Sequence, residues 1–546
     1  MSISERVSTS CIEESFSVRR DRKAAVSKRG MVATAFPEAT AAGVSMLKKG
    51  GNAVDSTCAA ALALGVCEPQ ASGLGGQSTA LLYVDRRMVA IDGSSRAPSM
   101  THASLLKEGS ALLTGYRAAT VPSTVAALGY MAERYGQLDW QTIIAPAIRI
   151  ARRGYRITPL QNKAQAANMD ELLSVGSGAA YFLKDGQVPY EPGDLFVQED
   201  LADTLTHLAD FGYGSFYHGA MADRIDSDMR KNGGLLRKDD LAQMPTPVER
   251  TPISREYRGL HIYTIPPPGA GDTMLLVMML LGNIHRRHLI AKSPEAYHYI
   301  AEAFRKALLY RTQRPFDPNT YHQIQNSIHL SPKFAKQLSA SIRNTVDPAL
   351  PSGGGVEDIE DTTHLSVMDS EGNAVSLTQS IELVYGSKAA AGGMGFLYNN
   401  YMSAFDTKRS SHPFFLRPNA VPWSSVCPSM VFDGKEPWIA LGSPGSSRIF
   451  STVSLFLSRL LDEGNSMYVA MERPRMHCSL NGTISLEKDD SADALARHLK
   501  AKGYTIDIRE RYSFYLGAIH AVLRCRTRPG FQGVAEVRRD GTAAGP

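Results

Sequence analysis

The sequence predicts an α+β protein in which helices are layered on sheets. Two observations indicate this fold class. Helix-forming segments dominate from Ser123 to Leu308, whereas hairpin, loop, strand and helix patterns alternate after Asp361. With 546 residues, of which 43% are hydrophobic and 21% charged, the chain has the composition of a soluble globular protein. Length alone favours roughly two to four domains.

Residues 1–30 are expected to form a basic, flexible tail ahead of the folded part, with an electrostatic arm as the alternative. A net charge of +5 over this length is too small to indicate nucleic-acid binding. The first thirty residues contain no apolar core flanked by a small-residue cleavage site, so a cytoplasmic location is the default. The longest apolar run, Thr273–Leu281, is about half of what a membrane span needs.

The next segments give two helices and two strands. Phe36–Pro69 predicts a helix that ends at Gly50–Gly51 and a second, alanine-rich helix that packs closely against other elements. The stretch "GLGGQSTALLYVDRRMVAIDG" then predicts a glycine turn and two strands joined around Asp85–Arg87. The six cysteines lack metal-type spacing, and Cys58 and Cys67 are expected to be buried free thiols.

A linker and a hairpin follow. The Pro/Gly-rich passage Asp347–Asp361 is the strongest linker candidate. The runs His364–Met368 and Ala374–Thr378 are β-rich and flank the turn cluster "DSEGN", which predicts a hairpin. Folding it about Glu371 places Thr362 opposite Ser380, to within one register step, and directly opposed residues have Cα atoms about 4.5–5.5 Å apart. Spacing alone is better explained by the preference of hydroxyl residues for strands and strand ends.

A second candidate site is the strand, Gly/Ser turn and helix predicted over Pro437–Leu461. Backbone N–H groups at such a turn have no partner within the helix, so they can hold an anion or a developing oxyanion. The sequence "HRRH" (His285–His288) offers two metal-ligand side chains without a third in view, so it reads as a basic helix end. No metal or other cofactor is therefore expected.

The stretch "DTTHLSVMDSEGNAVSLTQS" closely resembles the processing site of γ-glutamyltranspeptidases, a branch of the N-terminal nucleophile hydrolases. Further blocks in family order, such as "YRAATVPSTVAAL", "LGSPGSSRI" and "RRDGTAAG", extend the resemblance from about Gly30 to Gly545. It implies a four-layer αββα sandwich formed by one globular unit. It also implies autocleavage into a large subunit, 31–361, and a small subunit, 362–546.

The implied chemistry explains the threonine at the junction. A free threonine hydroxyl is a poor nucleophile, but a chain-terminal threonine carries its own α-amine as a general base. That amine titrates near pH 7.7–8.0, so a useful fraction is unprotonated at about neutral pH. The amine does not exist before cleavage, which means that maturation precedes catalysis. The loop before Thr362 would let the Asp361 carbonyl reach the Thr362 hydroxyl.

The resemblance also implies the catalytic residues. Thr362 matches the nucleophile, and Ser380 stands where the family has a threonine that orients it. Gly445 and Ser446 match the Gly-Gly pair whose N–H groups form the oxyanion hole. Serine at the second position is tolerable if its φ is negative.

The residues that would recognise the acyl group differ from the family pattern. Ser424 and Ser425 match a Ser-Ser pair that binds the substrate α-carboxylate, but Ser94 occupies the place of the arginine that clamps it. Arg96, two residues further on, would replace that arginine only if the loop has a different conformation from that of the family. Three contacts to the substrate α-amine also change, to Glu382, Tyr401 and Ala404.

The sequence therefore predicts an autoprocessing amide-bond hydrolase or acyltransferase with an altered acyl-recognition pocket. Its partners would be a small-molecule amide or peptide substrate and its own two subunits. Three alternatives stay open: a genuine γ-glutamyl transferase or glutathione hydrolase, a natural-product-pathway homologue that cleaves an unusual acyl or carbon–carbon bond, and an uncleaved, non-catalytic scaffold. A denaturing gel separates the enzyme, with two bands, from the scaffold, with one.

Overall fold

The structure is a computed structural model that describes residues 23–102, 112–244, 247–290, 294–313, 330–347, 361–527 and 529–546. Its centre holds two seven-stranded antiparallel sheets. The first contains, in order, β1 (Ala24–Ser27), β18 (Phe531–Ala535), β17 (His520–Arg524), β13 (Glu436–Gly442), β12 (Ser429–Asp433), β9 (Leu260–Thr264) and β8 (Ile253–Tyr257). The second contains β19 (Thr542–Ala544), β2 (Gly30–Thr34), β10 (Thr363–Asp369), β11 (Ala374–Ser380), β3 (Gln77–Val84), β4 (Arg87–Gly93) and β7 (Val248–Arg250).

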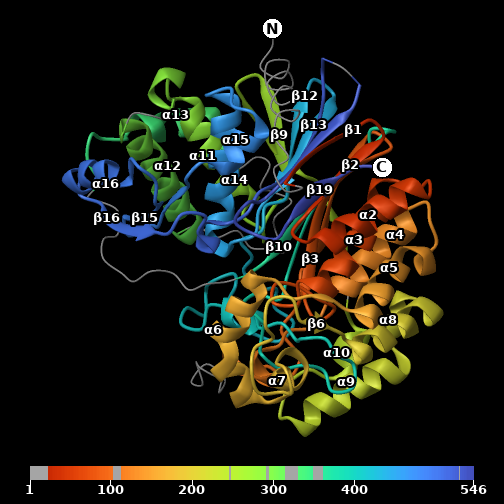
Figure 1. Ribbon diagram of the computed structural model, residues 1–546. Coiled ribbons are helices and arrows are strands. Elements are labelled where there is room, and N and C mark those ends of the chain that lie inside the picture. Colours follow the sequence, from red (N-terminus) through yellow and green to blue (C-terminus); the bar gives the residue numbers. More distant parts are fainter. Residues whose placement is uncertain are drawn as a thin grey trace.

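Helices cover both outer faces of the paired sheets, which gives the expected four layers (Figure 1). One side carries α2 (Pro37–Lys48), α3 (Ala53–Cys67), α4 (Thr124–Tyr135), α5 (Trp140–Arg153) and α8 (Glu199–Phe211). The other carries α11 (Gly271–Gly282), α12 (Pro294–Gln313), α13 (Pro332–Ala340), α14 (Ile449–Leu461) and α15 (Met467–Glu472). The mixed fold class predicted from the sequence is confirmed.

Smaller elements complete the described chain. They are α6 (Pro159–Val175), α7 (Ser177–Phe182), α9 (Gly219–Lys231), α10 (Lys238–Ala242), α16 (Ala492–Ala501), the pair β5 (Tyr155–Arg156) and β6 (Leu195–Phe196), and the sheet β14 (Met476–Cys478), β15 (Thr483–Glu487) and β16 (Thr505–Arg509). Three short 3₁₀ turns matter below: η8 (Tyr401–Ala404), η9 (Ser446–Arg448) and η10 (Phe514–Leu516).

The second sheet has two different faces. Leu365 and Val367 of β10 point outward into the core shared with α2 and α3, where they are fully buried. The alternate residues face the first sheet and are partly polar. Ser366 Oγ donates to the carbonyl of His520 at 3.1 Å, and Ser376 Oγ donates to that of Leu441 at 2.8 Å. These bonds join the sheets and satisfy hydroxyl groups that burial would otherwise penalise.

The early helices and strands agree with the sequence prediction. Helix α2 ends before Gly50, whose φ of 87° places it in the left-handed region that glycine adopts readily. The turn between β3 and β4 is made by Asp85 and Arg86, with φ of 51° and 61°. Such a left-handed pair matches the twist of a tight hairpin. Cys58 and Cys67 are buried free thiols, as expected.

Three expectations need correction or fall outside the described residues. The predicted tail is too long, because Ala24–Ser27 form β1 and pair with β18. The mainly helical stretch also contains β8 and β9, both in the first sheet. Residues 1–22 and most of the expected linker, 348–360, lie outside the described part of the chain.

Two features are absent from the described part of the chain. Among the described residues, no three His, Cys, Asp or Glu side chains gather in a way that could hold a metal ion. None of the helices in the described ranges is long and apolar enough to cross a membrane.

Candidate active site

The hairpin β10–β11 places Thr362 opposite Ser380, as its sequence predicts. Thr363 pairs with Gln379 and His364 with Thr378, which is the register obtained by folding about Glu371. The turn is held by Asp369, whose Oδ1 accepts the N–H groups of Glu371 at 2.9 Å and Asn373 at 3.0 Å. Side-chain capping of this kind specifies a turn locally. The pairing is therefore set by local chemistry.

The Asp361–Thr362 peptide bond lies inside a cluster of hydroxyl groups. The Asp361 carbonyl oxygen accepts hydrogen bonds from Thr362 Oγ1 at 2.8 Å and from Ser380 Oγ at 2.9 Å. The two hydroxyl oxygens are 3.3 Å apart, and Glu382 N donates to Ser380 Oγ at 2.8 Å. Thr362 is 4% exposed and Ser380 1%. The predicted nucleophile Thr362, the predicted neighbour Ser380 and the peptide bond predicted to be cut are thus together and shielded from bulk water.

The Asp361 side chain binds an arginine from the far end of the chain. Its Oδ1 accepts Thr362 N at 2.8 Å and Arg539 Nη1 at 2.7 Å. Glu68, at the C-terminal end of α3, has Oε1 3.5 Å from the same Arg539 nitrogen. Burial raises the pKa of both carboxyls, and the Arg539 charge opposes that rise. Sequence reasoning missed Glu68 and Arg539, although both lie in blocks that resemble the family.

The predicted Gly/Ser turn joins β13 to α14 through η9. Gly445 has φ of 121°, and a Cβ there would lie 3.0 Å from Gly517 Cα, so both conformation and space require glycine. The condition under which serine is easily tolerated at the second position, a negative φ, is not met, because φ of Ser446 is 56°. The turn starts close to β10, the strand that follows Thr362. A Cβ on Gly442, the last residue of β13, would lie 2.3 Å from the ring of His364 in β10.

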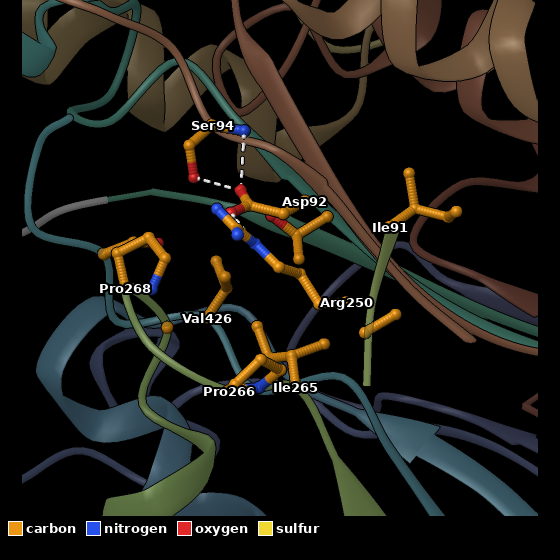
Figure 2. A pocket seen from close by; sticks show the side chains of 12 residues that line it. Ile91, Asp92, Ser94, Arg250, Ile265, Pro266, Pro268 and Val426 are labelled. Atoms are coloured by element: carbon orange, nitrogen blue, oxygen red, sulfur yellow. Dashed lines mark hydrogen bonds and ion pairs between the residues drawn. The ribbon is translucent and has the colours of Figure 1, made fainter. Parts of the chain in front are cut away.

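Ser94 is engaged within its own loop. Its N and Oγ both donate to Asp92 Oδ1, at 3.1 and 2.6 Å, while Arg250 Nε lies 3.2 Å from Asp92 Oδ2 (Figure 2). Ser94, Asp92, Arg250 and Ser424 line one small cavity. Sequence reasoning missed Arg250, which comes from β7, the edge strand beside β4. An arginine is therefore near the Ser94 position, but it comes from another element.

Arg96 does not line this cavity. Its backbone pairs with Val121, and its Nη1 donates to the Asn419 carbonyl at 3.3 Å. It lines a neighbouring cavity with Ser94 and Arg250, and Ser424 does not line that one.

The other predicted recognition residues fall into two groups. Glu382 and Tyr401 lie on adjacent segments, since Asn400 N donates to the Ile381 carbonyl at 3.2 Å. Glu382 has φ of 82°, and Tyr401 is 1% exposed at the start of η8, which ends at Ala404. Ser424 is buried and Ser425 half-buried.

The Ser424 segment is held by a residue that sequence reasoning also missed. Arg311 of α12 donates to the Ser424 carbonyl, and its guanidinium lies 4.5 Å from the Trp423 ring centroid. The side chain of Arg311 is about nine-tenths buried.

Comparison with known proteins decides the family. The sequence model described as Gamma-glutamyltranspeptidase matches residues 39–546, nearly the whole chain. The chain belongs to the gamma-glutamyltranspeptidase family.

Relatives within this family are named as hydrolases and acylases. The chain is 33% identical to the Glutathione hydrolase proenzyme of Escherichia coli K12, over 88% of this chain and 87% of that protein. It is 31% identical to the Acylase ACY 1 proenzyme of Pseudomonas sp. SE83, over 91% of each. The crystal structure of a cephalosporin acylase from Bacillus halodurans superposes with a TM-score of 0.87 and 27% identity, covering 97% of this chain and 98% of that one.

Family membership confirms several of the sequence-based predictions. The protein is an enzyme, a hydrolase or acyltransferase with the N-terminal nucleophile fold, so the non-catalytic scaffold is set aside. The Escherichia coli hydrolase and the Pseudomonas acylase are both named proenzymes, which agrees with one globular unit that is processed into two subunits.

Proposed function

We propose that this protein cleaves its own chain before Thr362 and then uses Thr362 to hydrolyse or transfer the acyl groups of amides. One observation carries the proposal: the Asp361 carbonyl oxygen accepts hydrogen bonds from both the Thr362 and Ser380 hydroxyls. N-terminal sequencing of the purified small chain tests it. A small chain that starts at any residue other than Thr362 contradicts the assignment.

Self-cleavage is an N→O acyl shift followed by hydrolysis. The Thr362 oxygen attacks the Asp361 carbonyl carbon, the C–N bond breaks, and the hydroxyl proton ends on the new amine. Water then hydrolyses the resulting ester to a carboxylate on Asp361 and a free hydroxyl on Thr362. Ser380 donates to the oxygen that becomes negative during attack, which stabilises the tetrahedral intermediate.

Turnover repeats this chemistry on an external amide. The new α-amine of Thr362 takes the hydroxyl proton as the oxygen attacks the substrate carbonyl. That proton leaves with the departing amine, and the acyl group stays on Thr362 as an ester. Water or an acceptor amine then releases it. The Gly445–Ser446 turn supplies backbone N–H groups for the oxyanion, in the role that the family resemblance implies.

The acyl group differs from γ-glutamyl in this proposal. The Ser94 hydroxyl is bound to Asp92, so position 94 offers no bidentate charged contact to a substrate carboxylate. Tyr401 and Ala404 stand where the family has polar or acidic partners for the α-amine. A buried ammonium or carboxylate without its partner costs several kcal/mol. Amides with one charged end or none are therefore the better substrates, and two relatives are named acylases.

Matched substrates test this choice. A γ-glutamyl anilide and the glutaryl anilide differ only by the α-amine, so the ratio of their kcat/KM values isolates recognition of that group. The glutaryl compound is expected to be the better substrate. A preference of about a hundredfold for the γ-glutamyl compound, or about 2.7 kcal/mol of transition-state discrimination, contradicts the altered pocket.

The second candidate is a genuine γ-glutamyl enzyme whose clamp is Arg250. The shared cavity of Arg250, Ser94 and Ser424 favours it. In that case Arg250→Met raises KM for the γ-glutamyl anilide and leaves KM for an uncharged acyl anilide unchanged. Arg250→Lys serves as the charge-preserving control, because lysine keeps the charge but loses bidentate geometry.

A further inference from the structure

The side chain that precedes the cut is held by a cation that the reaction chemistry does not use. Asp361 Oδ1 binds Arg539 Nη1 at 2.7 Å and, from the other side, the N–H of the bond to be cut at 2.8 Å. The Arg539 guanidinium also lies 3.4 Å from the Thr362 carbonyl and 3.9 Å from the Phe514 ring centroid. One fixed arginine thus contacts both residues of the scissile peptide.

The charges at this site do not balance. Asp361 and Glu68 are two carboxyl groups, and their side chains are 0% and 3% exposed. Within the described residues, Asp361 Oδ2, Glu68 Oε2 and Arg539 Nε and Nη2 have no hydrogen-bond partner. A single guanidinium compensates one carboxylate, and Asp361 is closer to it than Glu68 by 0.8 Å, the difference between 3.5 and 2.7 Å. The shorter contact favours ionisation of Asp361 before cleavage and protonation of Glu68, whose pKa burial raises.

We propose that Arg539 is a positioning residue for maturation: it clamps the Asp361 carboxylate so that the Asp361 carbonyl stays against the Thr362 and Ser380 hydroxyls. Glu68 then replaces Asp361 as the partner of Arg539 when the cleaved end leaves. This inference rests on the proposed cleavage before Thr362 and adds the device that holds the peptide for it.

Cleavage itself favours the exchange of partners. Hydrolysis of the ester creates a second carboxylate on Asp361, next to its side-chain carboxylate and Glu68. The two carboxylates of the cleaved Asp361 repel one another beside one guanidinium, and Asp361 sits at a free chain end. Glu68 is anchored by α3, so it stays and ionises beside Arg539. The site is thereby vacated without leaving a buried cation unpaired.

The test measures maturation separately from turnover. Pulse–chase in a cell-free translation mixture follows conversion of precursor into two chains, and kcat/KM is then normalised to the matured small subunit. Arg539→Met is expected to slow maturation at least tenfold, with partial recovery in Arg539→Lys. Asp361→Asn is expected to slow maturation while kcat/KM per matured molecule stays at the wild-type value, because Asp361 has left the site.

Controls separate positioning from misfolding. Asp540→Asn alters a largely buried carboxyl next to Arg539 that binds Thr158 Oγ1 at 2.7 Å, and it is expected to mature at the wild-type rate. The double variant Asp361→Asn with Arg539→Met is expected to mature no more slowly than Arg539→Met alone, because both changes break one contact. Thermal melting of each precursor shows whether it is folded.

Three outcomes each overturn either the clamp or the proposed function. If wild type cuts before Thr362 and Arg539→Met, folded by its melting profile, matures at the same rate, the clamp is wrong and the proposed function stands. If Arg539→Met does not fold, the single variant Asp361→Asn decides, and wild-type maturation in it overturns the clamp. If wild type never cuts at this bond, the proposed function itself fails.

Discussion

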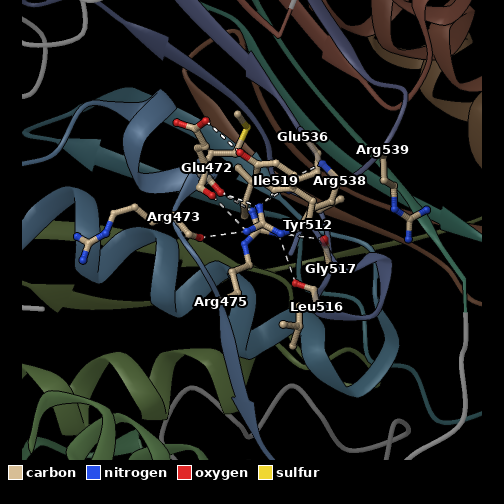
Figure 3. Close-up of polar contacts among 12 residues, drawn as sticks. Glu472, Arg473, Arg475, Tyr512, Leu516, Gly517, Ile519, Glu536, Arg538 and Arg539 are labelled. Atoms are coloured by element: carbon tan, nitrogen blue, oxygen red, sulfur yellow. Dashed lines mark hydrogen bonds and ion pairs between the residues drawn. The ribbon is translucent and has the colours of Figure 1, made fainter. Parts of the chain in front are cut away.

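Two buried ionic networks that meet at the neighbouring residues Arg538 and Arg539 are built in opposite ways. The arginine cluster consists of Arg475, Arg538, Glu487 and Glu536. The cleavage-site triad consists of Arg539, Asp361 and Glu68. In Figure 3 the guanidinium of Arg539 points away from the arginine cluster, although it is adjacent to Arg538 in sequence. The cluster pairs two cations with two carboxylates, whereas the triad pairs one cation with two carboxyls.

Hydrogen bonding separates them further. Glu536 accepts bonds from Arg475, from Arg538 at 2.8 Å and from Ile519 N at 2.6 Å. These contacts outweigh burial and lower the pKa of Glu536 to about 2. In the triad burial dominates, and the pKa of Glu68 is raised. A saturated, charge-balanced network holds a structure, whereas a charge-poor one is able to change partners when a bond is cut.

Removing the proposed nucleophile is expected to have the largest effect, because it abolishes both cleavage and activity. Thr362→Ala keeps the triad uncleaved, so the protein stays one chain and loses at least about 10⁴-fold in activity. A denaturing gel and an anilide assay measure both effects. Thr362→Ser is the control, because it keeps the hydroxyl and is expected to mature. Two chains in Thr362→Ala would show that the nucleophile lies elsewhere.

Changing one glutamate to glutamine in each network tests most directly whether the two networks differ in their contribution to stability. Glu536→Gln leaves two buried arginines short of a carboxylate and should cost about 3–5 kcal/mol in the free energy of unfolding. Glu68→Gln replaces a protonated carboxyl and should cost less than about 1 kcal/mol. Urea unfolding in the Thr362→Ala background compares both without cleavage. Equal costs would mean that the triad is as structural as the cluster.

Ser380 is expected to have the next largest effect. Ser380→Ala removes the donor at 2.9 Å from the Asp361 carbonyl, and losing one such donor costs about 2.7–4 kcal/mol in enzymes of known mechanism. Maturation should therefore slow by roughly 10²–10³-fold, and turnover should also fall. Ser380→Thr is the rescue variant. A wild-type rate of maturation in Ser380→Ala would show that the Ser380 hydroxyl does not assist cleavage.

The two networks should respond to pH with opposite signs. The folded pKa of Glu536 lies below its ordinary value of 4.5, so its stabilisation is complete above pH 4.5 and is lost as pH falls toward about 2. The folded pKa of Glu68 is raised, so its contribution is lost as pH rises above 4.5. The free energy of unfolding of the Thr362→Ala precursor can be measured by chemical unfolding across pH. Adding Glu536→Gln should weaken its dependence on pH below 4.5, and adding Glu68→Gln should weaken its dependence on pH above 4.5.

The smallest effect concerns the turn after β13. Ser446 has φ of 56°, where residues other than glycine are strained. Ser446→Gly should raise the free energy of unfolding by about 0.5–1 kcal/mol, with both ionic networks intact. Thermal melting measures it, and Ser447→Gly is the neighbouring control, expected to be neutral or destabilising. A loss of stability in Ser446→Gly would show that the serine side chain outweighs the backbone strain.

The sequence by itself determined the local elements and the centre of the site. A turn cluster and two β-rich runs specify the β10–β11 register, because turn capping and the two-residue period act over a few positions. These local signals were therefore enough to predict that Thr362 lies opposite Ser380. The helix–glycine–helix unit of α2 and α3 follows from equally local rules.

Only the tertiary structure decided which charged groups serve that centre. Arg539 lies 178 residues from Asp361 in sequence, and Arg250 lies 158 residues from Asp92. Their meeting depends on how the sheets stack and which strand lies at an edge, and no local pattern encodes this. The close approach of Gly517 to Gly445, 72 residues earlier in the sequence, is likewise a tertiary contact. Hydrogen-bonded turns are read from neighbours in sequence, whereas buried charges are paired by packing.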